Sequence, residues 1–153
     1  MYVMYSLKTP KKPLRHFRTS RFDPMRSPRI TLIRAWIFSV LIKLTNYFGV
    51  SVILLGPARS GKTYLLEKIV GEKIIDGRQA AKELNWRNEP ALDLQLIPNG
   101  SFGIDEAQLF SAHSLSKELK TLSNRDCILC FQSFEQFKNL LKLNHRFLVL
   151  ELK

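Results

Sequence analysis

Eight residues with two fixed glycines, a lysine and a threonine constrain this chain more than any other feature of its sequence. They match the pattern G-x-x-x-x-G-K-[ST] at every fixed position and read Gly56-Pro57-Ala58-Arg59-Ser60-Gly61-Lys62-Thr63. The run 51–55 before them is short, apolar and β-branched, as expected of a buried parallel strand. Residues 64–70 after them have helical character, and Gly71 is placed as a C-cap. The sequence therefore predicts a strand, a glycine-rich turn and a helix in direct succession.

This turn is suited to binding phosphate groups. The two glycines let the backbone curl so that successive N–H groups point inward as an anion nest. The helix that starts near Gly61 directs the positive end of its dipole to the same place. Lys62 can reach the β- and γ-phosphates of a nucleotide, and the Thr63 hydroxyl can ligate Mg²⁺. We therefore expect residues 56–63 to bind a nucleotide.

A nucleotide site of this kind also needs a carboxylate on the metal side, and the segment 100–108 contains an adjacent acidic pair. Asp105 is expected at the carboxyl end of a strand, facing Thr63 across the metal ion. Glu106 is then placed to activate the attacking water as a general base. A kinase with a bound acceptor needs no water activator, so the pair favours hydrolysis. The alternative is an acidic pair that only caps the following helix.

A further buried strand is predicted at 126–132, and it ends in Gln132. If this strand lies between the strands that end near residues 55 and 105, Gln132 points toward the γ-phosphate and can sense it by hydrogen bonding. A solvated glutamine at a strand end is the alternative. Cys127 and Cys130 of the same strand are expected to be core residues on opposite faces of the sheet, because no second pair is present to complete a zinc site.

Strands and helices are expected to alternate along residues 49–153. The strands fit at 50–55, 72–76, 100–105, 126–132 and 146–151, and the helices fit at 61–70, 77–86, 107–123 and 134–142. Alternation with short links predicts an α/β fold, with helices on both faces of a parallel sheet. A nucleotide then belongs at the carboxyl ends of the strands.

Taken together, the segments GPARSGKT, GIDEAQ and CFQS resemble P-loop ATPases of the additional-strand, catalytic-glutamate division. Within that division the chain is similar to the HerA/FtsK-type translocases, and more so to the zonula occludens toxin-like ATPases of filamentous phages and conjugative elements. The resemblance covers residues 50–152. It implies a three-layer P-loop NTPase with a five-stranded parallel sheet of order 5-1-4-3-2, ATP and Mg²⁺ as ligands, and a role in DNA-linked export, packaging or transfer.

Matched by motif, the resemblance also implies a role for each residue of the site. These are a phosphate-binding loop from Gly56 to Thr63, Mg²⁺ ligands Thr63 and Asp105, and catalytic residues Lys62, Glu106 and Gln132. Only 42 residues separate Lys62 from Asp105, which leaves little room for a lid or for DNA-facing loops. No arginine finger can be assigned, although Arg125 and Arg146 are candidates to reach the site of a neighbouring subunit.

The first 49 residues carry most of the excess positive charge. They hold ten lysines and arginines against one acid, for a net +9, whereas residues 50–153 carry +2 of the total +11. Residues 1–29 contain four prolines and show no sustained period, so we predict a flexible basic arm. Its positive field would attract DNA or an anionic membrane surface. A tail without a specific role is the third alternative.

Residues 30–48 are mostly apolar, and the two charges Arg34 and Lys43 leave a charge-free run of eight residues from Ala35 to Ile42. A spanning helix needs roughly 20 mostly apolar residues with few or no charges. Charges nine positions apart point to opposite sides of a helix, so we expect no wide apolar face. A helix that packs on the domain or lies at an interface is favoured, and a membrane span stays open.

The sequence thus favours a cytoplasmic, Mg²⁺-dependent ATPase that serves DNA transfer, packaging or the assembly of a mobile element. Peripheral attachment to a membrane and homo-oligomer formation stay open. The alternative is a non-hydrolysing, nucleotide-binding adaptor that docks on DNA, a membrane or a partner protein. A GTPase is disfavoured because no Asn-Lys-x-Asp motif follows a strand, and a small-molecule kinase is disfavoured by the acidic pair and the absence of an arginine-rich lid.

Overall fold

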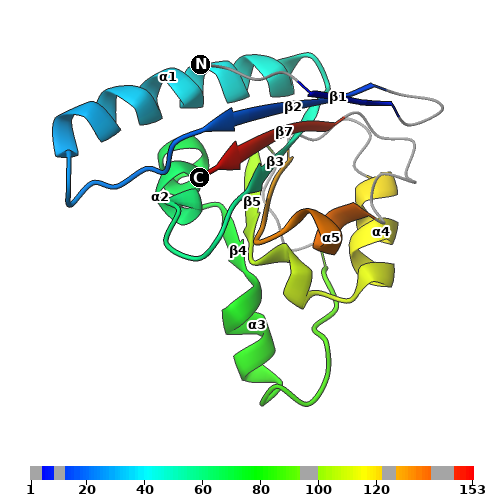
Figure 1. Cartoon of the computed structure of the whole chain (residues 1–153). Helices are drawn as coiled ribbons and strands as arrows, with labels where there is room; N and C mark the ends of the chain where they lie inside the picture. Colours follow the sequence, from blue (N-terminus) through cyan, green and yellow to red (C-terminus); the bar gives the residue numbers. More distant parts are fainter. Residues whose placement is uncertain (1–4, 9–12, 94–99, 122–126, 139–146) are drawn as a thin grey trace.

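A seven-stranded sheet forms the centre of the computed structural model, which describes residues 5–8, 13–93, 100–121, 127–138 and 147–153 (Figure 1). The strands are β1 (Tyr5–Lys8), β2 (Pro13–Thr19), β3 (Ser51–Leu55), β4 (Ile74–Asp76), β5 (Phe102–Asp105), β6 (Cys127–Phe131) and β7 (Phe147–Leu152). They lie in the order β1-β2-β7-β3-β6-β5-β4. The six strands β2 to β7 run parallel to one another, and β1 pairs with β2 in the antiparallel sense. The chain therefore has an α/β fold.

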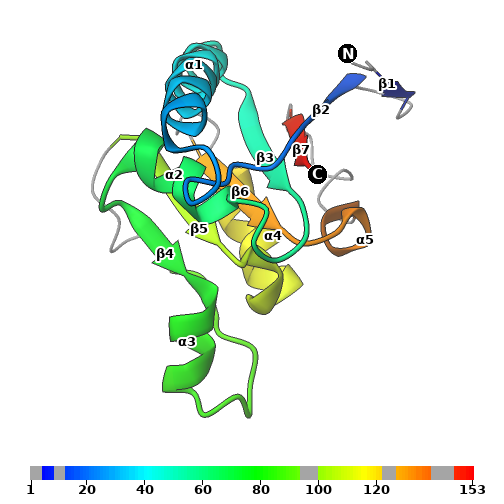
Figure 2. The same ribbon diagram turned by 60° about the vertical axis from the view of Figure 1, so that its left-hand side comes forward.

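The helices are α1 (Pro28–Tyr47), α2 (Lys62–Val70), α3 (Gly77–Glu83), α4 (Ala112–Thr121) and α5 (Phe134–Phe137), with a short 3₁₀ helix η1 (Ala107–Leu109) before α4. The helix expected at 77–86 ends three residues earlier, and the one expected at 107–123 is divided into η1 and α4. Of the helix expected at 134–142, only α5 falls within the described residues. Figure 2 shows α3 extending away from the sheet.

The order of the strands in the sheet agrees with the prediction from the sequence, but the number of strands does not. Strands β3 to β7 take the order β7-β3-β6-β5-β4, which is the 5-1-4-3-2 order implied by the resemblance. The predicted count of five was wrong, because β1 and β2 extend the sheet beyond β7.

The prediction of a flexible arm at 1–29 was therefore also wrong for the described residues. Strand β2 is stabilised by pairing with β7, which a local sequence period does not reveal, and Pro13 is tolerated at the strand start. Arg18 and Glu151 face each other in this pairing and form an ion pair at 2.8 Å. The side chain of Phe17 packs against the core.

Two hydrophobic clusters cover the two faces of the sheet, because successive strand residues point to opposite sides. In β3, Val52 and Leu54 face α1 and α2, whereas Ile53 and Leu55 face η1, α4 and α5. Cys127 and Cys130 are buried on opposite faces, as the sequence predicted. Burial raises the pKa of the Cys130 thiol well above its ordinary value, which keeps this thiol protonated. The layers are thus α1 and α2, the sheet, and η1 with α4 and α5.

Strand β5 contains a glycine because helix α2 approaches it closely. A Cβ atom at Gly103 would lie 2.4 Å from Cδ1 and 2.8 Å from Cγ of Leu66, which is fully buried. We predict that Gly103→Ala lowers the free energy of unfolding by about 1–3 kcal/mol, because the overpacked Leu66 must shift. Urea denaturation measures this loss. In a double-mutant cycle, Leu66→Ala should cost less in the Gly103→Ala background than in the wild type; equal costs would contradict the contact.

The segment between β2 and α1 packs into the domain through Phe22. The Phe22 ring is 2% exposed and meets the Phe38 ring edge-on, with 5.7 Å between centroids. Its backbone N–H donates to Ser60 O at 3.0 Å. The segment that leads into α1 is therefore attached to the glycine-rich turn that follows β3.

The prediction that α1 lacks a wide apolar face was wrong as well. The helix packs on α2 and β3 through one side only, and most of the large hydrophobic residues on its other side are exposed. Arg34 and Lys43 do point to opposite sides of the helix. They lie on the two borders between its two halves, so neither charge interrupts the apolar half. One half contacts the domain, and the other half is apolar.

Candidate functional site

The carboxyl ends of three neighbouring strands meet at one edge of the sheet. Leu55 of β3 pairs with Phe131 of β6, and Ile104 of β5 pairs with Leu129 of β6. Gly56 N–H donates to Phe131 O at 3.2 Å, so the turn after β3 begins beside the end of β6. Because the strands are parallel and in register, the residues that follow them lie together, as the sequence predicted.

The turn and the start of α2, residues 56–63, form a loop with an inner and an outer side. Gly56, Ser60 and Lys62 are buried, whereas Pro57, Ala58 and Arg59 are exposed. The buried hydroxyl of Ser60 has no hydrogen-bond partner among the described residues.

Gly61 is the N-cap of α2 and holds the left-handed conformation, with φ +88° and ψ +20°. A Cβ atom there would lie 2.3 Å from the Phe22 carbonyl oxygen, so only glycine fits. The chain therefore turns sharply into α2 and directs the helix N-terminus toward the loop.

Lys62 is the buried cation of the loop. Its ammonium donates to the carbonyl oxygens of Gly56 at 2.6 Å and Pro57 at 2.9 Å. None of the ion pairs formed by the described residues includes this lysine. Burial lowers the pKa of the Lys62 ammonium from its ordinary value. A phosphate group would supply the counter-charge that the loop carbonyls do not, so this cation suits an anionic ligand.

Thr63 and Asp105 meet at the mouth of the loop. The Thr63 hydroxyl donates to Asp105 Oδ2 at 2.5 Å, although the two residues are 42 positions apart. Asp105 is buried at the end of β5, as expected from the sequence. One or two protein oxygens of this kind are the donors that Mg²⁺ commonly uses, since it keeps several waters and takes further oxygens from phosphate.

Glu106 is the centre of a hydrogen-bonded group. Its carboxylate accepts from Gln132 Nε2 at 2.9 Å, from Arg78 Nη2 at 3.0 Å, and from the Gln108 side-chain amide. Glu106 has φ +49° and ψ +46°, a left-handed conformation that costs an L-residue about 1–2 kcal/mol. Such backbone conformations persist where surrounding contacts hold them and concentrate at functional sites. The structure thus brings Glu106 and Gln132 together, and β6, the strand before Gln132, lies between β3 and β5, which is the condition that the sequence analysis set.

Arg78 and Gln108 are the two members of this group that the sequence analysis missed. Arg78 follows β4 by two residues, and its backbone N–H donates to the N-cap side chain of Asp76 at 2.8 Å. Asp76 pairs with Asp105 across β4 and β5, which places the start of α3 beside the acidic pair. The rule that parallel strands gather their carboxyl ends at one edge, applied to the strand at 72–76, could have identified Arg78.

Arg125 and Arg146, considered as arginine fingers, lie outside the described residues. In the described part of the chain, no three or more His, Cys, Asp or Glu side chains are grouped so that they could hold a metal ion by themselves.

Comparison of the chain with models of known protein families and with curated proteins gave no match. The functional interpretation of this site therefore rests on its own geometry.

Proposed function

We propose that the chain is a Mg²⁺-dependent ATPase, with residues 56–63 as its phosphate-binding loop. The observation that carries this proposal is the contact between Thr63 and Asp105 at the mouth of a loop whose lysine is buried. A glycine turn before a helix can arise by chance. Here Asp105, distant in sequence, meets Thr63 of the loop itself. Both lie next to Lys62, a buried cation without a carboxylate partner among the described residues. A metal-bound triphosphate requires this arrangement.

In this proposal each residue has a distinct task. Backbone N–H groups of the loop and the N-terminus of α2 bind the phosphates. Lys62 exchanges its two carbonyl partners for phosphate oxygens, and Thr63 with Asp105 holds Mg²⁺. When bound, Mg²⁺ neutralises charge on the phosphate oxygens.

Glu106 and Gln132 act on the attacking water. Glu106 takes a proton from this water while the water oxygen forms a bond to the γ-phosphorus. The bond between the γ-phosphorus and the bridging oxygen breaks, and ADP leaves with that oxygen. Gln132 is positioned to orient the water or the γ-phosphate, because its amide lies 2.9 Å from the Glu106 carboxylate. The carboxylate already accepts from three donors, so this proton would take its remaining lone-pair site or displace one of them.

A nucleotide-binding adaptor remains the second candidate, and the geometry of Glu106 favours it. Both carboxylate oxygens of Glu106 are already engaged, one by Arg78 and the other by two glutamines. If these three donors keep the carboxylate turned away from the water when ATP is bound, the protein would bind the nucleotide without hydrolysing it. The proposed work on DNA or on an assembly of a mobile element, in the cytoplasm, rests on the resemblance alone, and turnover with and without DNA tests it.

Loss of the buried lysine should weaken nucleotide binding. We predict that Lys62→Ala lowers the affinity for Mg-ATP by about 10- to 100-fold, since a hydrogen bond to a charged group is worth roughly 1.5–3 kcal/mol. Isothermal titration calorimetry with Mg-ATP measures the change. Lys68→Ala is the matched control, because Lys68 is an exposed lysine of the same helix. If both variants bind Mg-ATP as the wild type does, residues 56–63 are not a nucleotide site.

A further inference from the structure

Helix α1 presents its apolar side to solvent and its smaller, more polar side to the domain, the reverse of the usual arrangement. The buried side consists of Thr31, Ala35, Ser39, Ile42 and Asn46. The opposite side, which we call the outer face, consists of exposed hydrophobic residues: Ile30, Leu32, Ile33, Trp36, Ile37, Val40, Leu41, Leu44, Tyr47 and Phe48. Large contiguous apolar patches are rare on soluble proteins and mark interaction surfaces.

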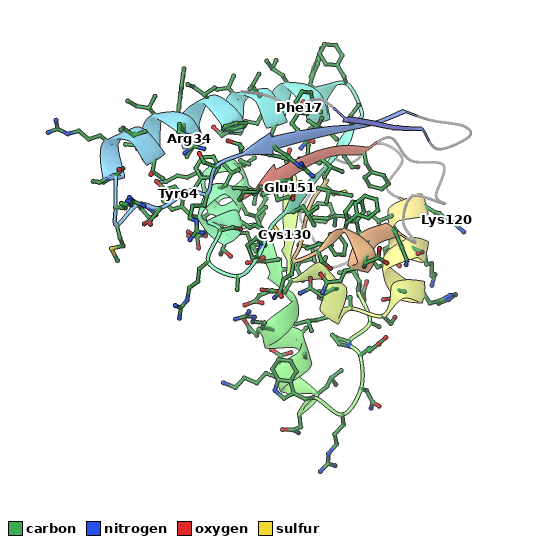
Figure 3. All side chains as sticks on the ribbon, in the orientation of Figure 1. Phe17, Arg34, Tyr64, Lys120, Cys130 and Glu151 are labelled. Atoms are coloured by element: carbon green, nitrogen blue, oxygen red, sulfur yellow. The ribbon has the colours of Figure 1, made fainter. Side chains whose placement is uncertain are left out.

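Arg34 and Lys43 border the outer face instead of interrupting it. Arg34 is directed toward the segment before α1, where Nη2 donates to Ser20 O at 2.8 Å and to Thr19 Oγ1 at 3.0 Å (Figure 3). Its guanidinium also lies over the Phe22 ring, 4.8 Å from the centroid. At about 100° per residue, Lys43 is on the opposite border of the apolar half.

Core packing does not account for the apolar composition of α1. Among the described residues, α1 is the one helix long and apolar enough to cross a membrane. Yet only 28% of its most apolar 18-residue stretch is buried. A core helix would bury most of such a stretch. Side chains project from α1 away from the rest of the molecule in Figure 3, and neither ribbon view shows another described element on that side.

The charged residues of α1 itself are all positive. No Asp or Glu occurs in the sequence between Asp23 and Glu67. Arg26 and Arg29 are exposed at the start of α1, and Lys43 is exposed near its end. An anionic membrane surface matches both features, because its headgroups attract these cations and its acyl boundary accepts the apolar side chains.

Other occupants match less well. A second copy in a two-fold interface would bring the same cations together without acids of the helix to pair with them. DNA offers phosphates but little apolar surface for ten hydrophobic side chains. A spanning orientation would require α1 to leave α2 and β3 and would expose Thr31, Ser39 and Asn46 to lipid.

We propose that α1 lies in the plane of an anionic membrane surface, with its outer face buried at the boundary between headgroups and acyl chains. Strand β2 and the segment through Phe22 attach the helix to the domain, so the sheet and the site beside Lys62 remain on the aqueous side. This membrane site is independent of nucleotide binding.

Flotation with lipid vesicles tests the surface directly. The full chain is mixed with vesicles of phosphatidylcholine alone or of phosphatidylcholine with phosphatidylglycerol. We expect binding only to the anionic vesicles, weakened by salt, and reduced at least about tenfold by the double substitution Trp36→Gln and Leu44→Gln. Trp86→Gln is the matched control, because Trp86 is 63% exposed in the segment that follows α3 and Trp36 is 67% exposed on the outer face.

Three results of this experiment would overturn the proposal. The first is no binding of the wild type to anionic vesicles, and the second is undiminished binding by the double variant. The third is a stable dimer, seen by light scattering, that the double substitution dissociates, because a second copy would then cover the outer face. Thermal unfolding confirms that each variant is folded, as expected for substitutions at exposed positions.

Tryptophan fluorescence and alkaline extraction test the depth of insertion. The chain has two tryptophans, so Trp86→Phe leaves Trp36 as the reporter and Trp36→Phe leaves Trp86. We expect anionic vesicles to shift the Trp36 emission to the blue and brominated lipid to quench it, with no change for Trp86. Alkaline carbonate should release the protein from the vesicles. Retention after carbonate would indicate a spanning helix and would overturn the interfacial placement.

Discussion

Replacing Glu106 by glutamine should lower ATP turnover by about 10²- to 10⁴-fold and leave the affinity for Mg-ATP within a few-fold of the wild type. Glutamine keeps the size of the side chain but cannot accept a proton from water. In the proposed site the contacts to phosphate and Mg²⁺ belong to other residues, residues 56–63 and Asp105, so the loss should fall on turnover and spare binding. Phosphate release under steady-state conditions and Mg-ATP titration measure the two quantities separately.

The folded state should tolerate this substitution. The partner in the ion pair of Glu106, Arg78, has a side chain that is 60% exposed, and pairs of this kind contribute little to stability. The amide can still accept a hydrogen bond from Gln132 or Gln108. We therefore expect the free energy of unfolding to change by less than about 1 kcal/mol.

The control for this experiment is Glu83→Gln, the same chemical change at an exposed position of α3. It should leave turnover unchanged. Turnover of Glu106→Gln close to the wild-type value would show that Glu106 is not the base. If the wild type itself has no turnover, with or without DNA, the adaptor is the better description of the protein.

The site was largely predictable from the sequence because it depends on the ends of elements. An apolar run placed the strand that ends at Leu55, and the adjacent acidic pair placed the strand that ends at Asp105. Parallel strands must gather their carboxyl ends at one edge. The meeting of Thr63 with Asp105 follows from that rule. The left-handed conformation of Glu106 and its bond to Arg78 do not, because both depend on how α3 leaves the sheet.

The N-terminal region was predictable only in its composition. Strand β2 exists because β7 provides a partner, and no local pattern in residues 13–19 announces that pairing. Helix α1 was expected, but its orientation was not. The sequence contains both an apolar half and a half with Thr31, Ser39 and Asn46, and only the packed structure shows that the domain contacts the second.

The second large effect is expected at Gly61. We predict that Gly61→Ala lowers the free energy of unfolding by about 2–5 kcal/mol, the sum of a left-handed alanine and an overpacked contact. The new Cβ would lie 2.3 Å from the Phe22 carbonyl oxygen and 2.6 Å from its Cβ. Phe22 cannot retreat easily, since its N–H is bonded to Ser60 O and its ring is buried against Phe38.

Gly49→Ala separates the two parts of this cost. Gly49 also has a positive φ, +69°, but a Cβ there would meet no atom within 4 Å. It should therefore lose only the conformational part, about 1–2 kcal/mol. Urea denaturation gives both values. Mg-ATP titration at low temperature should show at least about a tenfold loss of affinity for Gly61→Ala and none for Gly49→Ala, because relief of the contact at Gly61 displaces the loop that carries Lys62. Equal denaturation midpoints for the two variants would mean that the Phe22 segment yields freely. The segment before α1 would then place no constraint on the proposed phosphate-binding loop.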